Sequence, residues 1–132
     1  MRRFGMLTVV ARQLRIQYPG AVYHVMNRGD RGSPIFHGEL DYQLFLRTLE
    51  EACRKALWQV HAYCLMRDHF HLVIETSQPT LVAGMKWLLG TYTVRFNRRR
   101  RQFGHLFSGR YKAFDRSIQT GGARMVPGRG GV

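Results

Sequence analysis

Apolar and polar positions alternate along residues 21–26, a pattern typical of a β-strand. Because side chains two residues apart point the same way in a strand, Val22, His24 and Met26 would share one face. The residues between them would share the opposite face. A turn-forming Tyr-Pro-Gly sequence precedes this segment, so the pattern also predicts where the strand begins.

The spacing of apolar residues becomes helical over residues 39–55. The apolar face of this helix would consist of Phe45, Leu49, Ala52, Cys53 and Ala56. A second helix is predicted to begin with Thr80 as its N-cap. Its apolar stripe would consist of Leu81, Met85, Leu88, Leu89, Tyr92 and Phe96. Gly84 and Gly90 interrupt this stripe, and they predict the close approach of another backbone, either the sheet or nucleic acid.

Further strands are predicted on both sides of the second helix. Residues 58–65 and the segment that begins at His69 are separated by a short connection and predict an antiparallel hairpin. Residues 106–114 predict another strand, with Arg110 and Lys112 on one side. The resulting order is strand, helix, strand, strand, helix, strand. It indicates an α+β domain of the ferredoxin-like kind, in which an antiparallel sheet of about four strands packs with two main helices.

Two histidines in the hairpin are candidates for metal binding. His69 and His71 would project from one face of a strand, whereas Phe70 would point to the other. Two neighbouring imidazoles on a rigid strand make half of a divalent-metal site. The alternative interpretation is a pair of half-buried histidines on the surface of a sheet, because two ligands do not complete a coordination shell.

The composition indicates the class of partner. The 132 residues suffice for one domain with a substantial core, and their formal net charge is +13, with an isoelectric point of 11.0. Such an excess favours nucleic acid, with a membrane surface as the second candidate. No apolar run approaches transmembrane length and no signal peptide is recognisable. Cys53 and Cys64 lack a metal-site spacing, so we expect reduced cysteines in the core.

A run of arginines at the end of the second helix suggests where nucleic acid would bind. Such a run is commonly just a solvated helix end, but aromatic residues flank this one, as on surfaces that stack on bases. These aromatics are Phe96, Phe103, His105, Phe107 and Tyr111. The polar loop after the first strand adds two more arginines, either solvated or in contact with phosphate. The candidate DNA-binding residues are Arg28, Arg31, Arg95, Arg98, Arg99, Arg110 and Lys112.

Four segments resemble, in the same order, the REP-associated tyrosine transposases, which belong to the HUH single-strand nucleases. They are residues 14–25, 60–75, 90–99 and 104–113, and the HUH motif matches His69-Phe70-His71. The resemblance implies a ferredoxin-like fold in which His69 and His71 hold Mg²⁺ or Mn²⁺. It also implies that a tyrosine cleaves single-stranded or hairpin DNA and becomes joined to the 5′ phosphate. The expected setting is the bacterial cytoplasm, with no membrane and no small-molecule cofactor.

The catalytic tyrosine of the family does not carry over to this sequence. In the family it lies on a final helix, in a segment of the form Arg-Tyr-Ile-His-Leu-Asn-Pro, whereas no tyrosine follows Tyr111 here. Tyr92 and Tyr111 match non-catalytic tyrosines of the family. We therefore expect a copy that does not cleave DNA, whose histidine face lacks its covering helix.

The resemblance also suggests the domain boundaries. Residues 1–10 are expected to be an unmatched extension, in which Val10 marks an alternative start, and residues 11–114 the transposase domain. Residues 115–132 are rich in glycine and arginine, so we expect a disordered tail, introduced by a frameshift.

Two alternatives stay open at the level of sequence. A nucleic-acid-binding module without catalysis would explain the charge but not the histidine pair. A metal-dependent hydrolase would need more carboxylates, because the chain has only eight acidic residues and Glu75 is the only one on the His69 strand.

Overall fold

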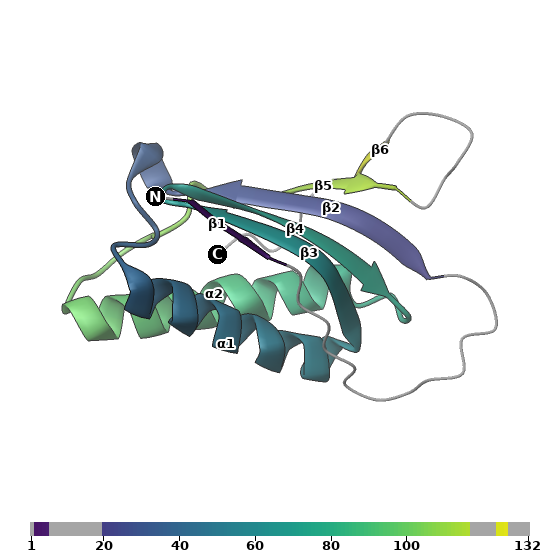
Figure 1. Cartoon of the computed structure of the whole chain (residues 1–132), viewed down its shortest axis with the longest axis horizontal. Helices are drawn as coiled ribbons and strands as arrows, with labels where there is room; N and C mark the ends of the chain where they lie inside the picture. Colours follow the sequence, from purple (N-terminus) through teal and green to yellow (C-terminus); the bar gives the residue numbers. More distant parts are fainter. Residues whose placement is uncertain (1, 6–19, 117–123, 127–132) are drawn as a thin grey trace.

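A computed structural model of the chain describes residues 2–5, 20–116 and 124–126, and it shows two helices on one face of an antiparallel sheet (Figure 1). The strands are β1 (Arg2–Gly5), β2 (Ala21–Arg28), β3 (Trp58–Met66), β4 (His69–Thr76), β5 (Lys112–Asp115) and β6 (Arg124–Val126). The helices are α1 (Glu39–Ala56), α2 (Leu81–Arg100) and the short 3-10 helix η1 (Asp30–Gly32). None of the described helices is both long enough and apolar enough to cross a membrane.

The four predicted strands form the centre of the sheet. The sheet order is β1-β3-β4-β2-β5-β6, and each neighbouring pair is antiparallel. The sequence order strand, helix, strand, strand, helix, strand together with the central order β3-β4-β2-β5 is the ferredoxin-like arrangement. This confirms the fold expected from the sequence.

Two edge strands extend this core beyond the expected four. β1 pairs with β3 and lies in the segment that the sequence placed in an unmatched extension. β6 pairs with β5 and lies in the segment expected to be a disordered tail, so Arg124–Val126 differ from that expectation. The other residues of the two segments, Val10 included, lie outside the described residues.

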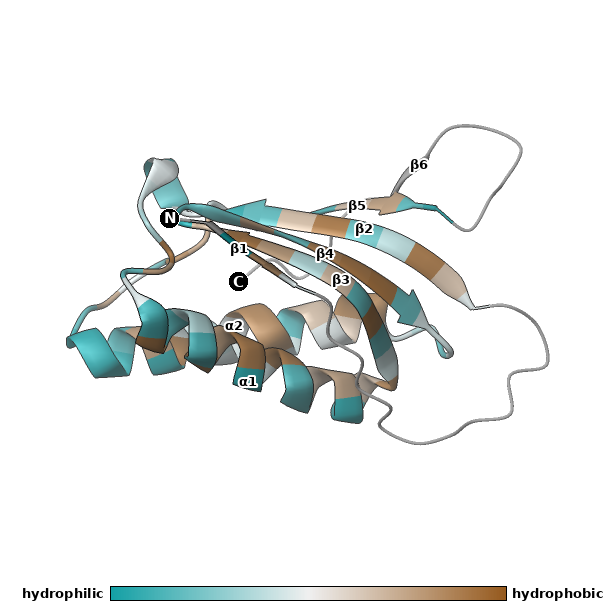
Figure 2. Ribbon diagram, in the orientation of Figure 1, coloured by the Kyte–Doolittle hydropathy of each residue, from teal (hydrophilic) through white to brown (hydrophobic). Residues whose placement is uncertain are grey.

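The core lies between the sheet and the two helices. Phe70, Leu72 and Ile74 of β4 are fully buried and face the helices, as the alternation predicted. Phe45 of α1 and Tyr92 of α2 meet edge to face in the same layer. The helices are hydrophobic toward the sheet and hydrophilic on their outer sides (Figure 2). The helix layer therefore covers only one face of the described sheet.

Two details of α2 differ from the sequence-based expectation. Thr80 occupies the N-cap position, but its hydroxyl donates to the carbonyl oxygen of Ala56 at 2.6 Å instead of capping the helix. At Gly84 the close neighbour is a side chain, not a backbone. A Cβ atom at this position would lie 2.2 Å from Cζ2 of Trp58 in β3. Gly84 therefore makes room for the buried indole.

The last predicted strand is much shorter than expected. Only Lys112–Asp115 form β5, whereas the preceding residues make a loop that includes one bridge from Phe107 to Gly29. Gly104 and Gly109 adopt positive φ angles of 91° and 104°, which an extended strand does not contain. Arg110 consequently lies in the loop and not on the strand with Lys112.

Candidate metal and nucleic-acid site

His69 and His71 lie side by side on the sheet face that the described helices leave uncovered. Their ring centroids are 5.1 Å apart and both side chains are half-buried. The arrangement follows from β4, in which every second residue is buried under the helices. The two imidazoles therefore point neither apart nor into the core, as the candidate site requires.

An acidic residue in the β3–β4 turn orients the first of these histidines. Oδ1 of Asp68 lies 2.8 Å from Nδ1 of His69. This hydrogen bond is the main cause of the lowered pKa of the Asp68 carboxyl. The carboxylate therefore stays charged and accepts the Nδ1 proton of His69. Nε2 of His69 is then the nitrogen with a free lone pair. Metal-binding histidines in proteins commonly have such a carboxylate behind them.

A third histidine, which the sequence did not suggest as a site residue, contacts the second one. Nε2 of His24 in β2 lies 3.0 Å from Nδ1 of His71. Burial is the main cause that lowers the pKa of both imidazoles from the ordinary value of 6.5, so both are neutral near physiological pH. If His71 binds a cation through Nε2, its Nδ1 carries the proton and donates it to His24.

The two candidate ligands are suitable for a cation that takes its other ligands from phosphate and water. Within residues 2–5, 20–116 and 124–126 no group of three or more His, Cys, Asp or Glu side chains is placed to hold a metal ion. Mg²⁺ usually keeps several waters and binds substrate phosphates, and Mn²⁺ accepts oxygen ligands and imidazole. Two imidazoles would thus supply only part of the coordination shell of such a cation.

A second polar pair lies farther along the same face. Oε1 of Glu75 is 2.8 Å from Nε2 of His61, which sits where the β3–β4 register shifts between Val60 and Ala62. Glu75 is six residues beyond His69 on β4 and is occupied by this contact. The pair offers a matched control for variants of the His69–His71 site.

Several of the candidate DNA-binding residues surround the histidine pair. Arg28 of β2 is the cross-strand neighbour of His69, and Lys112 of β5 lies opposite Met26, the neighbour of His71. Both side chains are exposed. Residues directly opposite in antiparallel strands share a face, so these two cations lie on the histidine face. Exposed Arg31 lies in η1, and exposed Arg110 lies in the loop before β5.

The arginines of α2 are divided between two environments. Arg95 makes a bidentate pair with Glu51 of α1, at 2.6 and 3.1 Å. Arg99 lies 3.5 Å from the buried carboxylate of Asp41. Arg98 is exposed in the last turn of the helix, at the hydrophilic end that Figure 2 shows. The structure thus gives Arg95 and Arg99 partners within the chain, which the helical spacing did not reveal.

The expected row of stacking aromatics is largely buried instead. Phe96, Phe107 and Tyr111 are each at most 2% exposed and belong to the core. Phe103, in contrast, is 97% exposed, and His105 is also exposed. Phe96 lies on the buried side of α2, and the Phe107–Gly29 bridge holds Phe107 against the residue that follows β2. Only Phe103 and His105 of that group lie on the described surface.

No described tyrosine is placed beside the histidine pair. Tyr23 and Tyr63 are cross-strand neighbours of Ile74 and Leu72, so they share the helix-covered face. Tyr42, Tyr92 and Tyr111 are at most 2% exposed. Tyr92 donates a hydrogen bond to the carbonyl oxygen of Ile35 at 2.6 Å, which confirms its place in the core. Tyr18 lies outside the described residues.

Comparison with known proteins gives one family. The family model described as transposase IS200-like matches residues 17–121. No curated protein matches the sequence significantly.

Two solved structures share the fold. One is a candidate transposase from Deinococcus radiodurans R1, which is 17% identical, with a TM-score of 0.61 over 83% of this chain and 87% of that one. The other is a REP-associated tyrosine transposase bound to a REP hairpin. It is 12% identical, with a TM-score of 0.58 over 82% of this chain and 64% of that one.

Proposed function

The chain belongs to the IS200-like transposase family, and from this we propose that it binds single-stranded or hairpin DNA on the histidine face of its sheet. A structural neighbour is a transposase bound to a REP hairpin, which supports a DNA partner of this kind. The net charge of +13 supports the same partner, because contacts to phosphates release condensed counterions.

The observation that carries this proposal is the set of side chains on the uncovered face. His69 and His71 lie side by side, and exposed Arg28 and Lys112 flank them on the same face. The side chains of Arg28 and Lys112 would hold the phosphates of a strand that passes over the imidazoles. Exposed Arg31, Arg98 and Arg110 would extend this contact, whereas the ion pairs of Arg95 and Arg99 give those two a role between helices.

We also propose that His69 and His71 hold Mg²⁺ or Mn²⁺ through their Nε2 atoms. Asp68 and His24 would accept the Nδ1 protons and keep both rings oriented. When bound, such a cation supplies Lewis-acid polarisation of a phosphate oxygen. The residues of the chain would bind the strand and orient the two imidazoles.

Strand cleavage is the part of the family chemistry for which the described residues offer no tyrosine on the histidine face. In the family reaction the tyrosine oxygen forms a bond to phosphorus, the bond to the 3′ oxygen breaks, and that oxygen takes up a proton. The tyrosines within residues 20–116 all lie on the helix side or in the core. We therefore propose that this chain binds hairpin DNA in the cytoplasm without forming the 5′-phosphotyrosine.

The experiment combines a native and a denaturing gel. The native gel compares binding of a palindromic hairpin and of an unstructured strand. The denaturing gel looks for a covalent adduct on a 3′-labelled oligonucleotide with Mn²⁺, beside a relative that retains the tyrosine helix. We expect hairpin binding and an adduct with the relative alone. Absence of DNA binding would refute the proposal, and an adduct with this chain would refute its cleavage part.

The alternative is a nucleic-acid-binding module that uses no metal. It is favoured by the absence of a tyrosine from the described histidine face. Mn²⁺ titration of the His69→Ala/His71→Ala double variant separates the two, with His61→Ala as control on the same face. We expect the double variant alone to lose Mn²⁺ binding. If the wild type, the double variant and His61→Ala bind Mn²⁺ equally, the result would favour the module that uses no metal.

A further inference from the structure

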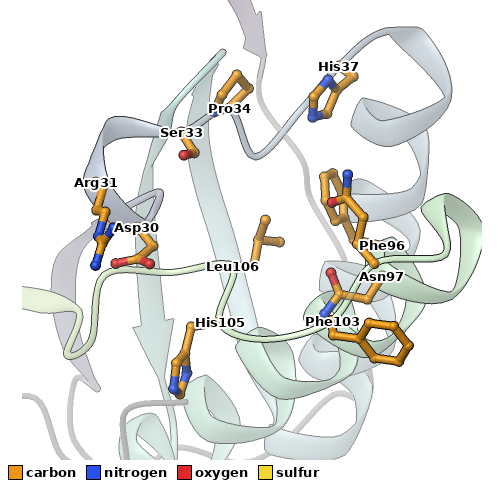
Figure 3. Close-up of a pocket in the computed structure, with 11 residues that line it drawn as sticks. Asp30, Arg31, Ser33, Pro34, His37, Phe96, Asn97, Phe103, His105 and Leu106 are labelled. Carbon is orange, nitrogen blue, oxygen red and sulfur yellow. The ribbon is translucent and has the colours of Figure 1, made fainter.

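A cavity of about 360 Å³ lies at the end of the molecule that carries the loop after α2 (Figure 3). One wall comes from residues 30–37, between β2 and α1, and the other from residues 96–106. The volume falls within the range of small-ligand pockets, roughly 300–1,000 Å³. None of the residues of the histidine pair lines it, so it is a separate site.

Backbone hydrogen bonds connect one wall of the pocket to the strands that carry the histidine pair. The amide of Gly29 donates to the carbonyl oxygen of Asp68, which precedes His69, at 2.8 Å. The next amide, that of Asp30, donates to the carbonyl oxygen of Leu106 at 2.9 Å, and both Asp30 and Leu106 line the pocket. Along the chain, Arg28, the cross-strand neighbour of His69, is thus separated from the pocket-lining residue Asp30 by Gly29 alone.

The charges that line the pocket do not favour a phosphate. The carboxylate of Asp30 stands beside the single guanidinium of Arg31. Burial, followed by the charge of Arg100, lowers the pKa of His37, so its imidazole is neutral near physiological pH. An anion placed here would meet a carboxylate and only one fixed positive charge. The exposed arginines at the end of α2 lie outside the pocket and are better placed for phosphate.

The remaining lining suits a flat heterocycle. Phe96 and Leu106 supply buried apolar surface, and Asn97 and Ser33 supply an amide and a hydroxyl. Nucleobases present a π-face together with donors and acceptors at their edges, so they can use both kinds of group. A single exposed apolar side chain on a surface needs no explanation by itself. Phe103 differs because its side chain is 97% exposed and it also belongs to the lining of this pocket.

The loop that presents Phe103 is fixed by its own hydrogen bonds. Nδ2 of Asn97 donates to the carbonyl oxygen of Gly104 at 3.0 Å, and the amide of Gln102 donates to the carbonyl oxygen of Asn97 at 2.9 Å. Gly104 takes a positive φ of 91°, where a side chain would be strained. These contacts fix the backbone of the loop, and the ring of Phe103 extends from the rim of the pocket into solvent (Figure 3).

We propose that this pocket binds one unpaired nucleobase of a single-stranded DNA segment, which stacks on Phe103. The proposal rests on the DNA-binding function proposed above and adds a base-specific contact to it. Stacking on one aromatic side chain typically contributes enough that its removal weakens binding about tenfold.

The test compares affinities for oligonucleotides in which each nucleotide in turn is replaced by an abasic site. With the wild-type protein one position should be sensitive, by about tenfold. Phe103→Ala should lose about the same factor with the intact oligonucleotide and lose nothing further with the abasic site at that position. Phe103→Trp should retain the affinity, and its fluorescence should be quenched by the intact strand but not by that abasic one. Val82→Ala, at the other end of α2, serves as the control for truncating an exposed apolar residue.

The outcomes separate the two proposals. If the wild-type protein binds none of the oligonucleotides, the DNA-binding function fails and the base pocket fails with it. If the wild-type protein binds but Phe103→Ala equals the wild type, the DNA-binding function stands and the base pocket is refuted. A loss in Phe103→Ala that is the same at every abasic position refutes it as well, because no single base would then contact the ring.

Discussion

Nε2 of His24 in β2 lies 3.0 Å from Nδ1 of His71 in β4, on the sheet face away from the helices. The contact depends on the β2–β4 register, which places His24 diagonally next to His71 with Met26 directly opposite. When His71 donates its Nδ1 proton to His24 in this contact, its Nε2 keeps a lone pair for a cation.

His24→Ala should therefore weaken Mn²⁺ binding without removing a ligand. Loss of a partner that orients a ligand commonly lowers metal affinity by about 10- to 100-fold. His24→Gln, whose amide oxygen can accept the same proton, should recover part of the loss. Calorimetric titration with Mn²⁺ measures both, with His61→Ala as the control on the same face. Wild-type affinity in His24→Ala would show that the contact has no role in cation binding.

Arg98 and Arg95, three residues apart on α2, should behave differently. Arg98 is exposed, whereas Arg95 pairs with Glu51 at 2.6 Å and also donates to Thr48 at 3.0 Å. Arg98→Ala should reduce the slope of log affinity for DNA against log salt by about 1 and leave stability unchanged. Arg95→Ala should leave the slope unchanged and lower the free energy of unfolding by about 1 kcal/mol. Salt titrations of DNA affinity and urea unfolding of both variants measure these effects. A reduced salt slope with unchanged stability in Arg95→Ala would show that Arg95 contacts DNA.

Gly84→Ala should destabilise the protein although alanine is the better helix former. The new Cβ would lie 2.2 Å from Cζ2 of Trp58, which is 2% exposed and cannot move into solvent freely. Overpacking of a core costs about 1–3 kcal/mol, more than the roughly 1 kcal/mol gained in helix propensity. In a Trp58→Phe background, which removes the contacted atoms, the same substitution should cost less. Urea unfolding of the four proteins gives the coupling, and additive effects would contradict this explanation.

The Glu51–Arg95 pair should make stability depend on pH in the acid range. The hydrogen bond from Arg95 is the main cause that lowers the pKa of Glu51 below its ordinary value of 4.5. The pair therefore contributes fully above pH 4.5 and loses its contribution as the pH falls through the lowered pKa. Because both side chains are about one-third exposed, the effect should stay below about 1 kcal/mol. Urea unfolding of wild type and Glu51→Gln should differ at neutral pH and converge in acid, and a constant difference would argue against it.

The sequence by itself determined the two helices, the strands β2, β3 and β4, and the faces that they bury. The alternation in β4 placed His69 and His71 on one side and Phe70 on the other, and the helical spacing placed Tyr92 in the core. These properties are periods of a single strand or helix, so a short window of sequence contains them. The order of these elements then sufficed for the ferredoxin-like fold, because consecutive elements usually lie next to one another.

Only the tertiary structure decided which side chains meet. His24 and His71 are 47 residues apart in sequence, and the register that joins them is set by burial of the whole sheet. The pairing of Arg95 with α1 and the burial of Phe107 beside an exposed Phe103 likewise depend on how separate elements pack. No local period records such contacts, because they result from many weak interactions optimised together across the core.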